Sequence, residues 1–535
     1  MKRLLKKFKW QNVLMIIILT VLTVTDIATS FTLSNTINAM IELNVEKFIH
    51  SITLTFIIYL LFLGMTYIKT LYQSKTEEKM KKFLRNRVVD RLTHTDYQGY
   101  HEHKPSTYAS WLMNDVNQIT TESLTPFYKL LSGIISLVIS VVTLLSLHWV
   151  LLAYTLIALG LILFIPKLFN TVIANASVKL TGQNEKYLNK ITDYLNAYDT
   201  LFSYRQLSFM QQQLDNQAEE LSSVSYKYQK LMAFVAVAGG FGNIVGQIGI
   251  FAVTGYLVLN GQLTVGSIMI TTTLAGNIFN TAGNLSQYIS KIQSSEPIFE
   301  KFEQIEISER SKKIDSSSKQ LAEGYNLKNV DFSYGDKQII HLLNGQFALD
   351  KNYAIIGESG SGKSTLLNLI GGRLDNYQGS IKFNGEDVNQ QPYDKLYDEV
   401  LYIDQTPHTF DGTIRENLEM GESYSDKKLW SALEKVYLKD LVSNTNDGLD
   451  YYIGESGKLL SGGQKQRLSI ARSLLREKKV LLLDEVTSSL DHDTAVNIEK
   501  LLLSEEKTSV IMITHNLRDE ISDEIDYKLE LTLFN

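Results

Sequence analysis

Gly357–Thr365 reads GESGSGKST, and this stretch decides the fold of the second half of the chain. It follows an apolar, strand-like run, Tyr353–Ile356, and leads into the helical run Leu366–Ile370. A strand, a glycine-rich loop and a helix in this order predict a phosphate-binding P-loop. The glycines let the backbone curl so that successive N–H groups point at phosphate oxygens, and the N-terminus of the helix adds positive potential. The candidate nucleotide-binding residues are Gly357, Glu358, Ser359, Gly360, Ser361, Gly362, Lys363, Ser364 and Thr365.

Within this loop two side chains have specific expected tasks. Lys363 reaches the β- and γ-phosphates of a nucleoside triphosphate, and the Ser364 hydroxyl is a ligand for Mg²⁺. A second apolar strand, Lys479–Leu483, ends in Asp484 and Glu485. Next to a P-loop, Asp484 suits a second Mg²⁺ ligand. Glu485 stands where it can orient or deprotonate the attacking water.

Leu460–Gln464 reads LSGGQ and leads into the helical run Lys465–Arg476. Taken alone, it is most simply a serine N-cap followed by a flexible glycine turn. Strand-like and helical runs alternate from Leu321 onward, which predicts a mainly parallel α/β domain over residues 321–535. The polar, Ser- and Lys-rich stretch 307–320 is the predicted linker.

Six apolar stretches, each long enough to cross a bilayer as a helix, dominate residues 1–306. Their predicted bounds are Val13–Leu33, Ile52–Tyr72, Lys129–Leu147, Val150–Leu168, Ala233–Val258 and Val265–Ile289. The first is read as a retained span rather than a cleaved signal, because its apolar run is long and contains Asp26. The fold class is therefore an α-helical membrane domain with six transmembrane helices, followed by an α/β P-loop ATPase domain.

Lys and Arg are concentrated at the N-terminus, between spans two and three, and between spans four and five. By the positive-inside rule these parts, both termini and the ATPase domain are cytoplasmic. The two long cytoplasmic segments are poor in Pro and Gly, so each is expected to form two helical legs of about 25 residues reaching roughly 35–40 Å. Such legs can carry motion between a cytoplasmic domain and the membrane.

Charge and cysteine content exclude other classes. The net charge of −6 leaves no basic footprint of a nucleic-acid-binding protein, so nucleic acid is not an expected partner. The chain has no cysteine, which excludes disulfides, thiolate metal sites and cysteine nucleophiles.

The sixth span carries a polar stripe at steps of three and four residues: Thr273, Asn277, Asn280, Asn284, Gln287 and Lys291. These steps place the stripe on one helix face. Asn243 and Gln247 form a similar pair in the fifth span. Amides in hydrocarbon need partners, so they either hydrogen-bond between helices or line a water-filled translocation cavity. The cavity is the preferred interpretation.

With these motifs in order, the chain resembles the ATP-binding-cassette (ABC) transporters, in the exporter form that fuses one membrane domain to one ATPase domain. Leu460–Gln464 matches the family signature, and the resemblance assigns roles to further residues. Tyr334 matches the aromatic residue that stacks on adenine. Gln405 matches the glutamine that senses Mg²⁺, Asp491 lies in the loop joining the two sites, and His515 matches the switch histidine on the γ-phosphate. Ser110–Val116 resembles the short helix at the tip of the first pair of legs, and Tyr198–Gln206 lies where the second is expected.

The resemblance implies a mechanism that uses ATP and Mg²⁺. Two ATPase domains face each other, and each ATP lies between one P-loop and the partner's signature residues Ser461, Gly462, Gly463 and Gln464. Closure of this dimer switches the membrane helices between two orientations, and hydrolysis resets them. The implied partner is a second half-transporter; an identical copy is favoured, because this chain carries both halves of a competent site, and a different subunit is the alternative.

ATP-driven export of an unidentified substrate, from a lipid-embedded protein of a bacterial cell membrane, is the leading prediction. An importer with an exporter-type fold and an ATP-gated channel or signalling subunit remain alternatives. Glu485 and His515 favour turnover over gating. The six spans exclude a soluble ATPase of the same superfamily.

Overall fold

The computed structural model describes residues 1–167, 169–303, 305, 308, 324–505, 507–515 and 517–532. The chain divides into two compact units, one of Met1–Val88 with Ser106–Gln304 and one of Val89–Pro105 with Ile305–Asn535. We refer to them as the membrane unit and the ATPase unit. The predicted linker 307–320 lies outside the described residues except for Ser308, so the domain boundaries at 306 and 321 stay predictions.

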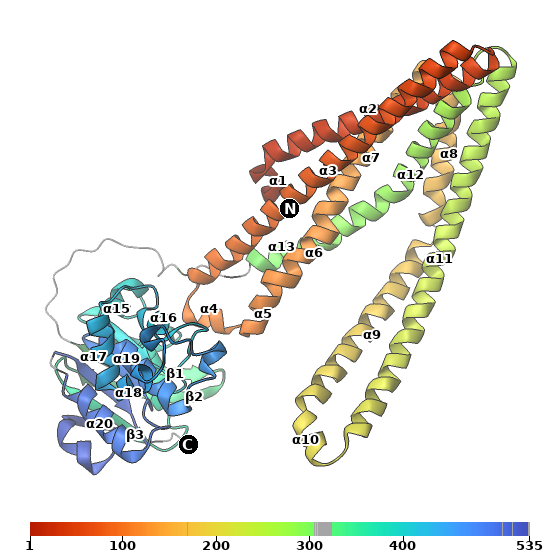
Figure 1. The fold of residues 1–535 in the computed structure, drawn as a ribbon. Helices are drawn as coiled ribbons and strands as arrows, with labels where there is room; N and C mark the ends of the chain where they lie inside the picture. Colours follow the sequence, from red (N-terminus) through yellow and green to blue (C-terminus); the bar gives the residue numbers. More distant parts are fainter. Residues whose placement is uncertain are drawn as a thin grey trace. The chain divides into compact units, whose positions relative to one another are not determined.

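Long helices make up the membrane unit (Figure 1). They are α1 (Lys2–Lys7), α2 (Lys9–Ile41), α3 (Val45–Thr93), α5 (Pro105–Ser110), α6 (Val116–Ile119), α7 (Thr125–Leu147), α8 (Trp149–Lys167), α9 (Asn170–Asn196), α10 (Tyr198–Ser203), α11 (Leu207–Leu259), α12 (Ser267–Ser294) and α13 (Glu296–Glu303), with π-helical turns η1 (Trp111–Asp115) and η2 (Thr120–Leu124) between α5, α6 and α7.

Each predicted span overlaps one of these helices, although Val265 and Gly266 precede α12 and Leu168 lies outside the described residues. In the described residues, four helical runs are long and apolar enough to cross a membrane: Lys9–Ile41, Val45–His94, Pro105–Leu147 and Leu207–Leu259. The other two predicted spans correspond to α8, with 19 residues, and to α12, with 28 residues. The polar stripe of α12 lowers its hydropathy, which is why length and composition alone do not single it out.

Side chains from five of the helices meet in one apolar core. Ile27 of α2, Leu144 of α7, Leu151 of α8, Ile250 of α11 and Leu274 of α12 are among its members. The spanning part of α3 adds nothing to this core. Most of its large apolar side chains are exposed, as expected where a helix faces lipid tails.

Threonine hydroxyls in the spans are satisfied within their own helices. Thr23, Thr55 and Thr254, for example, donate to the carbonyl four residues earlier at 2.9, 2.8 and 2.7 Å. A hydroxyl in hydrocarbon has no water to bond, so this local partner removes most of the cost of placing it there.

The predicted helical legs between spans four and five are present. In Figure 1, α9 and α11 run side by side and the short helix α10 joins their ends. Gln183 of α9 donates to Glu220 of α11 at 2.9 Å, and the rings of Tyr194 and Phe209 meet edge to face. Helix α11 has 53 residues, or roughly 80 Å at 1.5 Å per residue, so one helix serves as both leg and span.

The predicted tip helix of the first pair of legs is wrong. Ser110–Val116 is helical but lies inside the continuous helical run Pro105–Leu147, with Trp111 buried. The short helix after α3 is instead α4 (Tyr97–His101), where Asp96 accepts from the backbone N–H of Gly99 and acts as N-cap. Pro105 then starts the next helix, a position that proline favours.

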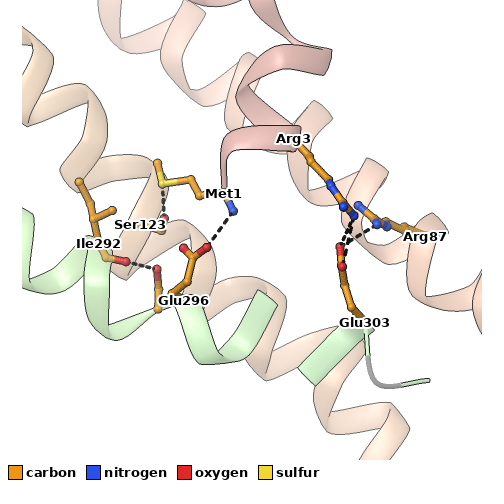
Figure 2. Close-up of polar contacts among 8 residues, drawn as sticks. Met1, Arg3, Arg87, Ser123, Ile292, Glu296 and Glu303 are labelled. Atoms are coloured by element: carbon orange, nitrogen blue, oxygen red, sulfur yellow. Dashed lines mark hydrogen bonds and ion pairs between the residues drawn. The ribbon is translucent and has the colours of Figure 1, made fainter. Parts of the chain in front are cut away.

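The N-terminus is fastened to the last helix of the membrane unit (Figure 2). Glu303 of α13 accepts from the guanidinium groups of Arg3 and Arg87, at 3.0 and 2.9 Å. The amino group of Met1 lies 3.8 Å from Glu296. Each of these pairs has at least one exposed partner, so it contributes at most about 1 kcal/mol, and the contacts orient α1 more than they stabilise it.

The ATPase unit is built on two sheets. The first is antiparallel, with order β2-β1-β4-β5, and the second is parallel, with order β6-β7-β8-β3-β9. The strands are β1 (Tyr325–Tyr334), β2 (Lys337–Phe347), β3 (Asn352–Gly357), β4 (Gln378–Phe383), β5 (Glu386–Asp387), β6 (Val400–Ile403), β7 (Val480–Asp484), β8 (Ser509–Ile513) and β9 (Tyr527–Leu531).

Its helices are α14 (Lys363–Ile370), α15 (Tyr393–Glu399), α16 (Ile414–Glu419), α17 (Asp426–Lys435), α18 (Lys439–Ser443), α19 (Gly462–Arg476) and α20 (His492–Leu503). The central strands β7 and β8 are buried along nearly their whole length, as parallel strands covered on both faces must be. The predicted mainly parallel α/β domain is therefore confirmed for the described residues.

Candidate functional site

The site lies at one edge of the parallel sheet. The P-loop follows β3, Asp484 and Glu485 stand at the end of β7, His515 follows β8, and Gln405 follows β6. Parallel strands point the same way, so their carboxyl ends meet at the same edge, where open α/β sheets bind their ligands. Segments 160 residues apart in the sequence are thus brought together.

Two glycines of the P-loop are required by backbone geometry. Gly362 has φ +93°, and a Cβ there would lie 2.9 Å from Cγ2 of Ile339. At Gly357 the φ is +151°, and a Cβ would lie 2.3 Å from the carbonyl oxygen of Leu531. Any L side chain would be strained at these two positions. The loop therefore curls as the sequence predicts.

The Lys363 amine is held inside this curl. Lys363 is 5 % exposed, and its Nζ donates to the carbonyl oxygens of Gly357 and Glu358 at 2.8 Å each. The hydroxyl of Ser361 is buried and has no hydrogen-bond partner among the described residues. An unpaired buried hydroxyl and an ammonium group bound only by neutral carbonyls suit a loop that receives an anion.

Asp484 is held from two sides. Its Oδ1 accepts from the Ser364 hydroxyl at 3.1 Å, and its Oδ2 accepts from the Tyr402 hydroxyl at 3.0 Å. The structure thus brings two of the three predicted Mg²⁺ ligands within hydrogen-bond distance, while the third, Gln405, contacts Glu485 instead. A serine hydroxyl beside a carboxylate is the kind of hard oxygen pair that this cation prefers.

Glu485 is the centre of a second group. His515 Nε2 lies 2.8 Å from Glu485 Oε1, and Gln405 Nε2 donates to Glu485 Oε2 at 2.8 Å. The Glu485 side chain is 15 % exposed, and its backbone has φ +50°, a strained value for a residue with a Cβ. Such backbone strain persists only where surrounding contacts hold the residue in place. Here the contacts with His515 and Gln405 hold the Glu485 side chain at the sheet edge.

A cavity of about 200 Å³ lies between the P-loop and the pair Glu485 and His515. Its lining residues are Ile339, Ser359, Gly360, Gly362, Lys363, Ser364, Thr365, Glu485 and His515. It is lined mainly by P-loop residues, and the carboxylate and imidazole face the same space. A phosphate in the loop would therefore lie beside a candidate base and a candidate γ-phosphate ligand.

The signature residues, Tyr334 and Asp491 are among the predicted residues that do not line this cavity. Ser461 caps α19 through a reciprocal pair of bonds with Gln464, so the simple N-cap interpretation is confirmed, but Ser461 and Gly462 are exposed to solvent. Tyr334 is 53 % exposed at the end of β1. Asp491 caps α20, and the backbone N–H of Thr494 holds the pKa of this carboxyl below its usual range.

Sequence reasoning missed Tyr402. This residue of β6 is 8 % exposed, and its ring lies 3.6 Å from the guanidinium carbon of Arg373, which forms a bidentate pair with Asp404. Burial, and next the negative charge of Asp484, raise the pKa of Tyr402 far above its ordinary value. Its hydroxyl therefore stays protonated and donates to Asp484. Tyr402 lies three residues before Gln405. The sequence signal that could have found it is a phenolic hydroxyl in an otherwise apolar strand.

In the membrane unit the polar stripe of α12 has partners on two neighbouring helices. Asn277 donates to Asp26 of α2 at 3.3 Å, and Asn280 accepts from Asn243 of α11 at 3.0 Å. Asn280 and Asn284 are exposed, whereas Leu274 and Ile278, off the stripe, are buried. Both interpretations of the stripe are therefore supported. The amides form hydrogen bonds between helices, and the exposure of Asn280 and Asn284 fits the lining of a cavity.

Comparison with known proteins identifies the family. Residues 13–282 match the family model described as ABC transporter transmembrane region, and residues 340–488 match the one described as ABC transporter. The chain belongs to the ABC transporters, and its ATPase is coupled to transport across a membrane. Half-transporters of this kind work as dimers.

Individual relatives are similar over most of the chain. An uncharacterized ABC transporter ATP-binding protein of Bacillus subtilis, YwjA, is 26% identical over 86% of this chain and 81% of its own length. A multidrug resistance ABC transporter ATP-binding and permease protein of Lactococcus lactis is 25% identical, over 85% and 78%. An ATP-dependent lipid A-core flippase of Desulfotalea psychrophila is 27% identical, over 78% and 74%.

The fold is similar to that of a solved structure, a bacterial Atm1-family ABC exporter with ATP bound. The TM-score is 0.81 at 22% identity, and the match covers 99% of this chain and 95% of the other. The fold class is thereby shown: a helical membrane domain followed by a P-loop ATPase domain.

Proposed function

We propose that this chain is one subunit of a dimeric exporter that uses ATP hydrolysis to move a substrate out of the cytoplasm. The observation that carries the proposal is the convergence of Gln405, Glu485 and His515 at the mouth of the P-loop. Relatives named as a multidrug transporter and a flippase support the direction. An importer or a gated channel fits them less well.

The residues of the site divide the reaction between them. When ATP binds, Lys363 exchanges its two carbonyl partners for oxygens of the β- and γ-phosphates. The ammonium group then faces negatively charged oxygens instead of neutral carbonyls, which strengthens its hydrogen bonds. Glu485 orients and deprotonates the attacking water, and His515 contacts the γ-phosphate. In this arrangement the protein acts mainly by positioning groups and stabilising charge, as is general in phosphoryl transfer.

Ser364, Asp484 and Gln405 would hold Mg²⁺ with the nucleotide. The Ser364 hydroxyl and the Asp484 carboxylate already share a hydrogen bond of 3.1 Å, so the donor set fits the ion. Bound Mg²⁺ supplies charge neutralisation at the phosphate oxygens.

The exposed signature residues support a shared site. Ser461 and Gly463 start α19, where free backbone N–H groups attract anions, yet they lie outside the cavity of their own chain. They would bind the γ-phosphate of a partner's ATP, with Asp491 near the junction and Tyr334 stacking on adenine. Because this chain carries both halves, we propose a homodimer, with a heterodimer as the alternative.

The location follows from charge and hydropathy. The chain is an integral membrane protein, and the Lys- and Arg-rich N-terminus and legs support a cytoplasmic position for both termini and the ATPase unit. Its bacterial relatives support a location in a bacterial cell membrane, surrounded by lipid. The domain organisation we propose is a membrane domain over residues 1–306, a linker over 307–320 and an ATPase domain over 321–535.

The test is the Glu485→Gln variant in reconstituted protein. The variant keeps the size of the side chain and loses the base, so hydrolysis is expected to fall about 10²–10⁴-fold while ATP still binds. Glu434→Gln, an exposed surface carboxylate paired with Lys439, is the matched control and should retain full activity. Near-normal turnover by Glu485→Gln with bound ATP would contradict the assignment.

The homodimer is tested separately by expressing this chain alone. Its mass in detergent or nanodiscs and its ATPase activity are measured together. An active species with the mass of two copies is expected. A stable, inactive monomer that gains activity only with a second gene product would show that the partner is a different subunit.

A further inference from the structure

Asp26 is the only carboxylate in the six predicted spans. It lies within α2, well inside the predicted span Val13–Leu33, and is partly exposed rather than sealed in the core. A carboxylate at this depth is costly to keep charged unless it has a partner, and such residues commonly mark a ligand or ion path. Asp26 therefore needs an explanation beyond helix packing.

The protein itself gives Asp26 little compensation. Its carboxylate accepts one side-chain hydrogen bond, from Nδ2 of Asn277, and at 3.3 Å this bond is long. An ionised carboxylate can accept about four hydrogen bonds. Within the described residues no Lys or Arg forms an ion pair with Asp26. The remaining acceptor positions are available to a ligand.

Amides extend from this point across the neighbouring helix. Gln247 of α11 donates to Asn243 at 2.7 Å, and Asn243 donates to Asn280 of α12 at 3.0 Å. Gln247 Nε2 also lies 3.8 Å from the position that a Cβ would take on Gly276, next to Asn277. The carboxylate and the amides thus belong to one polar surface on α2, α11 and α12.

The helices approach closely at this surface because small residues separate them. A Cβ on Gly246 would lie 2.8 Å from the ring of Phe279, so only glycine allows α11 and α12 to pack here. Tight packing holds these amides in fixed positions. A few fixed polar groups beside a single negative charge are typical of a selective ligand-binding site.

We propose that Asp26 is the counter-ion for a positively charged substrate, and that the amides of α11 and α12 bind its polar groups. The substrate class is an amphipathic organic cation, because exposed apolar side chains next to the amides, Ile244 and Ile248 of α11, can contact hydrocarbon while one carboxylate receives the charge. This inference rests on the proposed transport function and names the substrate class of its membrane site. An anionic substrate would meet an unfavourable charge there.

The experiment compares tetraphenylphosphonium with tetraphenylborate, which have nearly the same size and shape and opposite charges. Stimulation of ATP hydrolysis and uptake into proteoliposomes are measured for the full-length protein. Tetraphenylphosphonium is expected to stimulate hydrolysis and to be transported, and tetraphenylborate is not. Asp26→Asn should raise the half-stimulating concentration of the cation about 10-fold or more, since it removes a charged hydrogen-bonding partner.

Asp26→Glu keeps the charge and should retain the preference for the cation, which separates charge from folding. Glu42→Gln, at the end of the same helix and paired with Lys47, is the matched control and should behave as wild type. Equal responses to both ions, or an unchanged cation response in Asp26→Asn, would overturn the inference. Hydrolysis of ATP without stimulation or transport by tetraphenylphosphonium, or transport of tetraphenylborate alone, refutes the substrate class. The proposed function fails separately, if Glu485→Gln hydrolyses ATP at a near-normal rate.

Discussion

Replacing Tyr402 by Phe removes one hydroxyl that bonds Asp484 beside the P-loop. The Tyr402 hydroxyl donates to Oδ2 of Asp484 at 3.0 Å, while the ring is fixed by Arg373 at 3.6 Å and is 8 % exposed. The phenyl ring should therefore keep its place, and only the bond that orients Asp484 is lost. Groups that orient a metal-binding carboxylate typically contribute 10–100-fold to metal affinity or activity. We expect the Mg²⁺ concentration for half-maximal hydrolysis to rise about 10-fold or more.

The assay measures ATP hydrolysis at fixed ATP over a series of free Mg²⁺ concentrations. Binding of Mn²⁺ in the presence of ATP, followed by electron paramagnetic resonance, gives a readout that does not depend on turnover. The matched control is Tyr397→Phe, because this tyrosine loses one bond of 2.8 Å to the carbonyl of Gly371, outside the cavity. Both variants should lose about 1 kcal/mol of stability. An unchanged metal requirement in Tyr402→Phe, or an equal rise in both variants, would refute the role of this hydroxyl.

Three further outcomes are expected. Glu499→Gln removes the buried charge that binds Arg518, three residues beyond His515, and should lower the hydrolysis rate and the melting temperature. Glu499→Ala should lower both further, because it also removes the hydrogen-bonding group. A cysteine at Asn284 should react with a water-soluble thiol reagent and change its rate when ATP is trapped, while a cysteine at the buried Ile278 stays protected. Gly362→Ala should lose nucleotide binding, measured with a fluorescent ATP analogue, because a side chain at φ +93° costs about 1–3 kcal/mol.

Local signals predicted the elements of this fold well. Hydrophobic runs located the membrane helices, although α2, α3 and α11 extend well beyond the predicted spans, and the strand, loop and helix around Gly357 formed where the sequence placed them. The order of the parallel sheet was not predictable in this way, because β3 pairs with β8 and β9, more than 150 residues later. Such pairing depends on burial of both faces, which the sequence of one strand does not specify.

The wrong tip helix has a related cause. Ser110–Val116 is helical, as its pattern indicates, but periodicity does not report where the chain reverses direction. The reversal was marked by local chemistry instead: Asp96 caps α4, and Pro105 opens the following helix. Capping and proline signals therefore locate a turn between two legs better than resemblance of the helical stretch beside it.

In the candidate ATP site, the role of a residue was predictable when the adjacent sequence determines that role. Lys363 and Ser364 belong to the P-loop, and Glu485 directly follows a buried strand, so their chemistry could be assigned from neighbours in the sequence. Tyr402 and Asp26 were different, because each acquires a role through a partner far along the chain. Tyr402 bonds a residue 82 positions later and the amide of Asn277 is 251 positions from Asp26. The sequence thus shows that a polar side chain in an apolar strand or span needs a hydrogen-bond partner. Which residue is that partner, and therefore what the side chain does, depends on how the helices and strands pack.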